Sequence, residues 1–138
     1  MRKINHSYNI IWTAVEEFDY RSFENELIKY DAYLNMESKV VNLSNMLNFN
    51  KDSRQAICYA DGVENPACMT SIQFLIEDKT VHMICNFRSQ HEKLGRPSDE
   101  IMLKFLATKF INKSKIDIEN IKITCNVADY HEYKIWII

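Results

Sequence analysis

Cysteine is the residue type in this chain best suited to nucleophilic chemistry, because a thiolate attacks carbon readily once its pKa is low enough. Three of the four cysteines, Cys58, Cys85 and Cys125, lie in apolar, β-prone stretches, where a reduced cysteine commonly fills the core. Cys68 does not lie in such a stretch. Taken alone, it is equally compatible with a small core residue and with a nucleophile.

The spacing of the cysteines gives no sign of a metal site. No two of them form a C-x-x-C pair, so we expect no zinc. Residues 1–8 are polar and do not form a secretion signal, and no apolar run approaches the ~20 residues of a membrane helix. We therefore expect a cytoplasmic protein with reduced thiols, no metal and no membrane contact.

The bulk composition is that of one globular domain. Of the 138 residues, 46% are hydrophobic and 26% are charged, and 17 basic residues stand against 19 acidic ones. This balance leaves no basic excess to hold a phosphate backbone, so we expect no nucleic-acid partner. With only two glycines and two prolines there is no recognisable linker, and residues 1–138 are expected to form a single domain.

The apolar pattern predicts helices in the N-terminal half and one more near the C-terminus. The first begins after the capping residue Ser22 and the second spans residues 40–47, each with apolar residues at helical spacing (Phe23, Leu27, Tyr30 and Leu34; Val40, Leu43 and Leu47). A further helix is expected over residues 98–113. Only a narrow stripe of it is polar, so this helix should be mostly buried.

Strands are expected from Arg54 onward. Residues 55–60 form a short β-prone stretch, and the alternating runs 71–76 and 81–87 flank a polar turn, which predicts a β-hairpin. A last strand is expected from Ile121 toward Tyr133. Helices followed by strands and one buried helix predict an α+β domain with a mainly antiparallel sheet.

Five separated segments form an ordered pattern. They are residues 52–54 (Asp-Ser-Arg), 65–68 (Asn-Pro-Ala-Cys) with Gln-Phe at 73–74, 88–89 (Arg-Ser), 94–99 (Leu-Gly-Arg-Pro-Ser-Asp) and 129–133 (Asp-Tyr-His-Glu-Tyr). Their order resembles the thymidylate synthase superfamily, which carries a Ser-Arg-Arg loop, Pro-Cys-His before Gln-Phe, Arg-Ser before Leu-Gly-x-Pro-Phe-Asn, and Asp-x-His-x-Tyr. The resemblance covers residues 52–133 and implies a truncated, divergent member with that fold.

The resemblance implies a pyrimidine nucleoside 5'-monophosphate as substrate and gives each matched residue a role. Cys68 would add to C6 of the base, and Arg88 would lower the thiol pKa and bind the phosphate. Family dimers send arginines into the partner's phosphate site, so Arg54 implies a homodimer. The other implied substrate-binding residues are Ser89 at the phosphate, His131 and Tyr133 at the sugar hydroxyl, and Gln73 on the strand after the cysteine.

Position 99 bears on the base. Family members that use uracil hold it with asparagine at this position, whereas members that hydroxymethylate cytidylates carry aspartate. A carboxylate accepts a hydrogen bond from the exocyclic amine of cytosine. Asp99 therefore favours CMP or dCMP, and the resemblance points to a transferase of one-carbon groups to C5, of the hydroxymethylase kind.

Each matched residue also has a structural interpretation. Asp99 begins a helix, where aspartate is a good cap or first-turn residue. Arg88 and Ser89 are compatible with a surface arginine and a turn residue at a strand end. His131 and Tyr133 are compatible with half-buried residues on one face of a strand. Only the joint pattern favours a nucleotide site.

The folate half of the family's site is less well matched than the nucleotide half. Met69 replaces the histidine after the cysteine, and His91 replaces the aspartate that helps to organise the folate. We interpret His91 as a loop residue. Methylenetetrahydrofolate is the implied one-carbon donor, but the features that bind it are largely missing. Two alternatives stay open: a nucleotide-binding or regulatory protein without catalysis, and a subunit that needs a partner chain.

Overall fold

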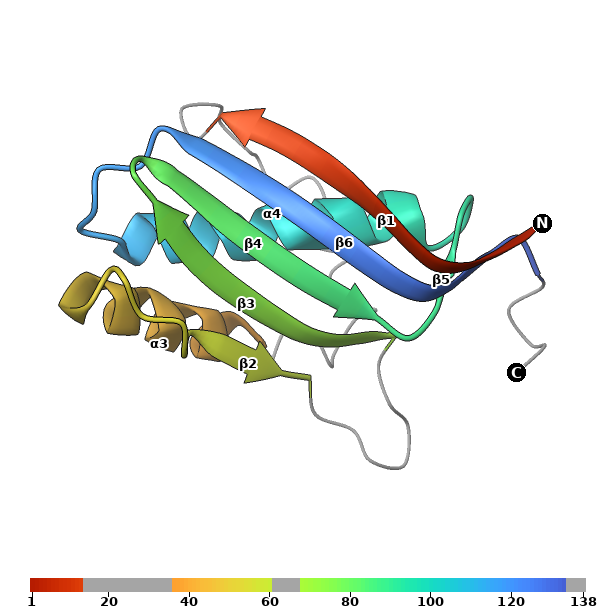
Figure 1. The fold of residues 1–138 in the computed structure, drawn as a ribbon, viewed down its shortest axis with the longest axis horizontal. Coiled ribbons are helices and arrows are strands. Elements are labelled where there is room, and N and C mark those ends of the chain that lie inside the picture. Colours follow the sequence, from red (N-terminus) through yellow and green to blue (C-terminus); the bar gives the residue numbers. More distant parts are fainter. Residues whose placement is uncertain (14–35, 61–67, 134–138) are drawn as a thin grey trace.

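The computed structural model describes residues 1–13, 36–60 and 68–133, which form a six-stranded sheet and two helices on one of its faces (Figure 1). The elements are β1 (Arg2–Thr13), α3 (Met36–Phe49), β2 (Ile57–Tyr59), β3 (Met69–Glu77), β4 (Thr80–Phe87), β5 (Gln90–His91), α4 (Arg96–Lys113) and β6 (Asn120–His131). The helix expected after Ser22 and residues 65–67 lie outside the described residues.

Antiparallel pairing prevails in the sheet, whose strand order is β1-β6-β4-β3-β2 with β5 pairing to β6. β1 with β6, β2 with β3 and β3 with β4 are antiparallel, whereas β4 and β5 each pair with β6 in parallel. The parallel pair β4–β6 is joined through α4, as parallel strands require a crossover connection. The predicted α+β domain with a mainly antiparallel sheet and a buried helix is confirmed.

The β3–β4 hairpin forms where the sequence predicts it. Its two-residue turn consists of Asp78 and Lys79, and Asp78 has a φ of 53°, which aspartate tolerates in such turns. Ile72 lies opposite Cys85, and both are fully buried. The alternation of apolar residues therefore turns one face of the hairpin toward the helices.

Strand β1 corrects the expectation that the N-terminal half is helical. It pairs with β6 from Arg2–His131 to Thr13–Asn120. Trp12 belongs to the core, and Tyr8 and Ile10 pack against it. These residues alternate at period two, which is the signal for a strand. Their polar neighbours Ser7 and Asn9 are exposed on the face opposite the helices and make the first part of the segment look hydrophilic.

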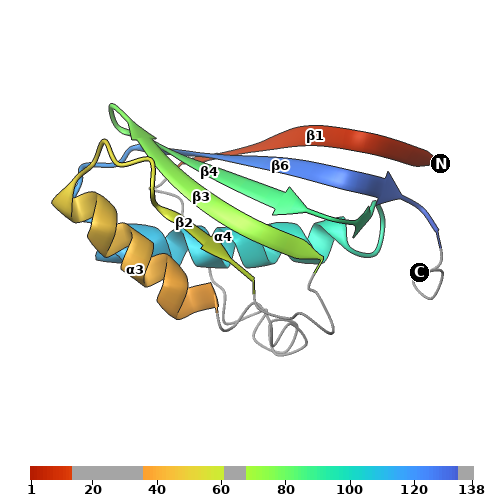
Figure 2. The same ribbon diagram turned by 60° about the horizontal axis from the view of Figure 1, so that its bottom comes forward.

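The helices cover the opposite face of the sheet, as Figure 2 shows. In α3, Val40, Leu43 and Leu47 are buried as the spacing predicts. Helix α4 is also buried on much of its surface and begins two residues earlier than expected, at Arg96. The Phe110 ring of α4 stacks on Phe74 of β3, with centroids 4.1 Å apart and planes 10° apart. This pair joins α4 to the sheet inside the core.

Replacing Phe110 with alanine is expected to lower the free energy of unfolding by about 3–5 kcal/mol, because the change removes a buried ring and leaves a cavity. Urea unfolding followed by circular dichroism measures the effect. The matched control is Phe49→Ala, since Phe49 is 95% exposed, and its effect should stay below about 0.5 kcal/mol. Equal losses in the two variants would contradict this core.

Candidate functional site

One end of the sheet gathers most of the candidate residues. β3 begins directly after Cys68, and its antiparallel partner β4 ends directly before Arg88. The Arg88 backbone N–H donates to the Cys68 carbonyl oxygen at 2.7 Å. Because β6 runs parallel to β4, its last residue, His131, lies at the same end (Figure 1). The fold therefore brings together segments separated by more than forty residues of chain.

Ser89 and His131 contact each other at this end, with Ser89 Oγ 3.0 Å from His131 Nε2. The Tyr133 backbone N–H donates to His131 Nδ1 at 3.1 Å. Because Nδ1 accepts this bond, neutral His131 carries its proton on Nε2 and donates it to Ser89 Oγ. The Ser89 hydroxyl can then donate its own hydrogen to a further acceptor, such as a phosphate oxygen.

Asp99 is buried in the first turn of α4, with 4% of its surface exposed. A chain of two hydrogen bonds holds it: the Tyr8 hydroxyl donates to Gln90 Oε1 at 2.8 Å, and Gln90 Nε2 donates to Asp99 Oδ2 at 3.0 Å. Burial raises the pKa of Asp99 to about 6, although the bond from Gln90 lowers it. The N-cap is Gly95, and no side chain caps the helix. Asp99 is therefore a first-turn residue but not the cap.

The turn before α4 requires close packing around Gly95. A Cβ at this position would lie 3.2 Å from the His91 backbone nitrogen and oxygen and 3.7 Å from Asp99 Oδ2. His91 Nδ1 accepts hydrogen bonds from the backbone N–H groups of Lys93 and Leu94, each at 3.1 Å. His91 therefore stabilises the turn. It is the last residue of strand β5 and pairs with His131, so its interpretation as a loop residue is wrong.

Cys68 is exposed, and the charges of Arg88 and Asp99 shift the pKa of its thiol in opposite senses. Burial of the sulfur raises the pKa of Cys68, Arg88 lowers it, and Asp99 raises it, so that the thiol pKa ends above its ordinary value. The protein without ligand therefore holds Cys68 mainly as a thiol at neutral pH. The pKa-lowering effect expected of Arg88 is present but does not prevail.

The other cysteines are buried, as the sequence predicts. Cys58 is 9% exposed, and Cys85 and Cys125 are fully buried. Burial raises the pKa of Cys58 to about 11. These three thiols are core residues, which leaves Cys68 as the exposed thiol of the chain.

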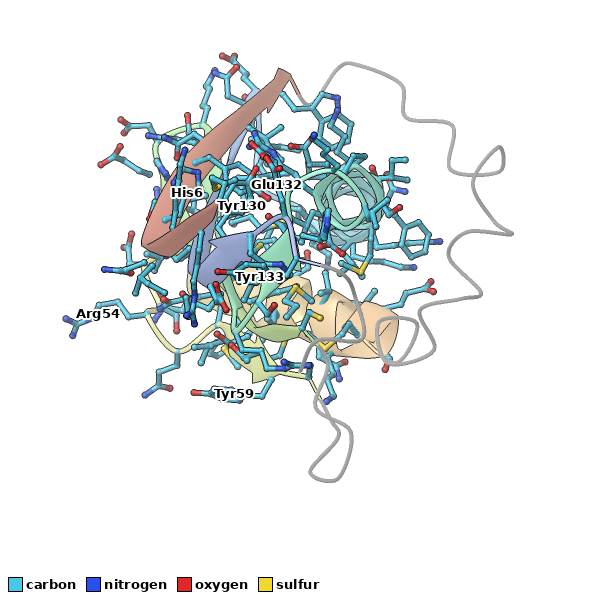
Figure 3. The ribbon with its side chains drawn as sticks, turned by 90° about the vertical axis from the view of Figure 1, so that its right-hand side faces the viewer. His6, Arg54, Tyr59, Tyr130, Glu132 and Tyr133 are labelled. Atoms are coloured by element: carbon cyan, nitrogen blue, oxygen red, sulfur yellow. The ribbon has the colours of Figure 1, made fainter. Side chains whose placement is uncertain are left out.

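Arg54 and Gln73 lie apart from this end of the sheet. Gln73 Nε2 donates to the Arg54 carbonyl oxygen at 3.0 Å. Gln73 is five residues along β3 from Cys68, a distance of about 16 Å in an extended strand. Figure 3 shows the Arg54 side chain extending away from the protein, on the side of the sheet opposite the helices. The structure thus gathers Cys68, Arg88, Ser89, Asp99, His131 and Tyr133 at one end, without these two residues.

Two residues of the site, Tyr8 and Gln90, were missed in the sequence. Gln90 directly follows Ser89 and is 2% exposed, so a glutamine next to the matched pair was the available signal. Tyr8 is 82 residues away from Gln90 in the chain. No local pattern marks it as a site residue, because its contact depends on the pairing of β1 with β6.

Comparison with known proteins shows a likeness at the level of structure. No family model matches the chain, and no curated protein matches it. The thymidylate synthase of T4 phage matches with a TM-score of 0.60 and 14% identity, over 72% of this chain and 36% of that one. The thermostable thymidylate synthase A of Bacillus subtilis matches with a TM-score of 0.57 and 19% identity, over 67% and 35%.

These likenesses define the fold class as thymidylate synthase-like. The chain spans about a third of the length of the two synthases it matches. Within the residues that the structure describes, no group of three His, Cys, Asp or Glu residues could hold a metal ion. No helix among them is long and apolar enough to cross a membrane.

The pH dependence of Cys68 alkylation by iodoacetamide tests the electrostatics of the site. We expect its midpoint to lie above that of an ordinary thiol. Asp99→Asn should lower the midpoint because a negative charge near the thiolate is removed, and Arg88→Gln should raise it because a positive charge is removed. Mass spectrometry of the Cys68 peptide measures the rate at each pH.

The matched control is Asp117→Asn, because Asp117 is exposed and lies just before β6, at the other end of the sheet. This variant should keep the wild-type midpoint. A Cys68→Ser protein gives the background from the buried thiols. Identical midpoints in wild type, Asp99→Asn and Arg88→Gln would contradict the described electrostatics.

Proposed function

We propose that this protein binds a pyrimidine nucleoside 5'-monophosphate, CMP or dCMP, and that Cys68 adds to C6 of the base. The observation that carries the proposal is a set of contacts: the Arg88 backbone N–H donates to the Cys68 carbonyl oxygen, and Gln90, two residues later, donates to the buried carboxylate of Asp99. A hydrogen-bonding group for the base and a nucleophile thus flank one short segment of the chain. Perturbed carboxyl and thiol groups at one site are typical of functional sites.

The phosphate would bind at Arg88 and Ser89, on the segment that follows β4. A guanidinium can donate two parallel hydrogen bonds to a phosphate, and the Ser89 hydroxyl can add a third. His131 supports this arrangement because its Nε2 hydrogen bond to Ser89 leaves the hydroxyl hydrogen for the ligand. Tyr133, which stacks on His131 with ring centroids 5.4 Å apart, would border the sugar.

The base would lie between Asp99 and Cys68. The carboxylate of Asp99 accepts from the exocyclic amine of cytosine, which uracil lacks. The thiolate of Cys68 adds to C6, and the electron pair of the C5–C6 bond makes C5 nucleophilic. C5 then takes a proton from water, loses its original hydrogen as a proton, and the thiolate leaves. This sequence exchanges the C5 hydrogen without any oxidant or reductant.

Hydroxymethylation at C5 is the finer form of the proposal, and the resemblance to cytidylate hydroxymethylases supports it. It needs a one-carbon donor such as methylenetetrahydrofolate. The residues of this chain do not fit the folate side, because His91 replaces the expected aspartate and its Nδ1 is engaged by the turn. No step through a folate follows from these residues. C5 hydrogen exchange is the part of the chemistry that they support.

A homodimer is part of the proposal because of Arg54. Within one chain, its carbonyl is bonded to Gln73, which lies about 16 Å along β3 from Cys68, farther than an arginine side chain extends. Its side chain points away from the uncovered face of its own sheet (Figure 3). In a dimer formed through that face, Arg54 of one copy would contact the phosphate of the nucleotide bound to the other copy. A monomer at micromolar concentration in analytical ultracentrifugation would contradict this role.

A nucleotide-binding protein without catalysis is the second candidate function. The raised pKa of Cys68 favours it, because a thiol that stays protonated is a weak nucleophile. Both candidates share the same binding residues. They differ in whether Cys68 forms a covalent bond with the base.

Release of tritium from CMP or dCMP labelled at C5 separates these two candidates. Wild-type protein is expected to release tritium to water, because addition to C6 labilises the C5 hydrogen. Cys68→Ser should lower the rate at least about a hundredfold, the scale expected when a covalent nucleophile is removed. Cys58→Ser is the matched control and should keep the rate in folded protein.

Binding of the nucleotide without tritium release, at an affinity unchanged by Cys68→Ser, would refute the catalytic proposal in favour of the second candidate. Absence of any binding of CMP, dCMP or UMP would refute both.

Asp99→Asn should shift the base preference toward uracil. The asparagine amide can donate to O4 of uracil, whereas the carboxylate repels it. Isothermal titration with CMP and with UMP should show that the ratio of their affinities falls by about tenfold or more, the worth of one charge-assisted hydrogen bond. Asp117→Asn serves as the control. An unchanged ratio would remove the argument for cytosine.

A further inference from the structure

Tyr8, Gln90 and Asp99 form a polar chain that links three elements, β1, β5 and α4. Gln90 is 2% exposed and Asp99 is 4% exposed, so the hydrogen bond between them is shielded from water. Within the described part of the chain, no buried polar side-chain atom lacks a partner. A satisfied polar chain at this depth fixes the orientation of its members.

The Tyr8 hydroxyl and the Asp99 carboxylate together hold the Gln90 amide in one orientation. The hydroxyl donates to Gln90 Oε1, and this leaves Nε2 to donate to Asp99 Oδ2. The reversed amide would place Oε1 against a carboxylate oxygen, which is repulsive when Asp99 is ionised. Gln90 therefore presents a donor to Asp99 and stabilises its ionised form.

We infer that Gln90, aligned by Tyr8, is a positioning residue that keeps Asp99 a hydrogen-bond acceptor and thereby gives the site its preference for cytosine over uracil. The inference rests on the proposed nucleotide site. An ionised Asp99 accepts from the cytosine amine and repels O4 of uracil, whereas a protonated Asp99 can donate to O4. The charge state of one carboxyl group thus decides between the two bases.

The neighbours of Asp99 do not replace the donor that Gln90 provides. Glu100 raises the pKa of Asp99, as burial does, and Gln90 lowers it. Arg96 is engaged with Glu100 at 2.9 Å and with the Tyr130 hydroxyl at 3.0 Å. The titratable groups that interact with this chain or with Asp99 are Tyr8 on β1, Cys68 before β3, Cys125 on β6, and Arg96 and Glu100 on α4.

The test replaces Gln90 with methionine, which has a similar length but no amide. The ratio of CMP to UMP affinity is measured by isothermal titration from pH 5 to pH 9. In Gln90→Met, the ratio at pH 7 should fall by about fivefold, the worth of one hydrogen bond. It should recover at pH 9, where Asp99 is ionised without help. A purely structural role of Gln90 would not produce this recovery.

Tyr8→Phe provides a second variant that keeps the ring and removes only the hydroxyl. It should lower the ratio less than Gln90→Met, and the double variant should behave as Gln90→Met alone, because both changes act through one chain. Gln55→Met is the matched control, since Gln55 is exposed, and should keep the wild-type ratio. Circular dichroism verifies that each variant is folded.

The outcomes separate this inference from the proposed function. If wild-type protein prefers CMP and folded Gln90→Met and Tyr8→Phe keep the same ratio at every pH, the inference is wrong and the proposed function stands. If wild-type protein binds no pyrimidine nucleotide, the proposed function fails and the inference fails with it. A lowered ratio that recovers at high pH supports both.

Discussion

The interaction on which the site depends is the hydrogen bond from Gln90 to the buried carboxylate of Asp99. Burying an ionisable group is costly unless polar partners surround it, and the raised pKa of Asp99 expresses that cost. The first turn of α4 offsets part of it, because the helix N-terminus favours negative charge. Gly95 completes the arrangement, since any side chain there would press on the turn and approach Asp99 Oδ2. A buried carboxyl group with a raised pKa is typical of sites that serve function rather than stability.

The parallel pairing of β4 with β6 gives this interaction its chemical surroundings. It places the ends of both strands side by side, so that Ser89 meets His131, and it requires the crossover in which α4 carries Asp99. The hairpin brings the start of β3, and with it Cys68, to the same end. The charge of Asp99 then raises the pKa of the Cys68 thiol. A ligand that neutralises the Asp99 carboxylate would remove a negative charge that raises the pKa of the Cys68 thiol. Binding of the base would in this way favour the thiolate that attacks it.

The sequence predicts those parts of the fold whose signals are local. The alternation on either side of Asp78 predicts the hairpin, and the nearly continuous apolar surface around Phe110 predicts a buried helix. Strand β1 was not predicted because Ser7 and Asn9 lie between its apolar residues and are exposed on the face of the sheet opposite the helices. Within the site, the spacing of Arg88 and Asp99 from Cys68 could be recognised, whereas the role of Tyr8 could not. Contacts between residues far apart in the chain depend on strand pairing, which no local pattern contains.

The crystal structure of the protein with bound CMP tests the central claim most directly. We expect the exocyclic amine of cytosine within hydrogen-bonding distance of the Asp99 carboxylate, C6 next to the Cys68 sulfur, and the phosphate at Arg88 and Ser89. CMP bound elsewhere, or bound with its base turned away from Asp99 and Cys68, would contradict the account.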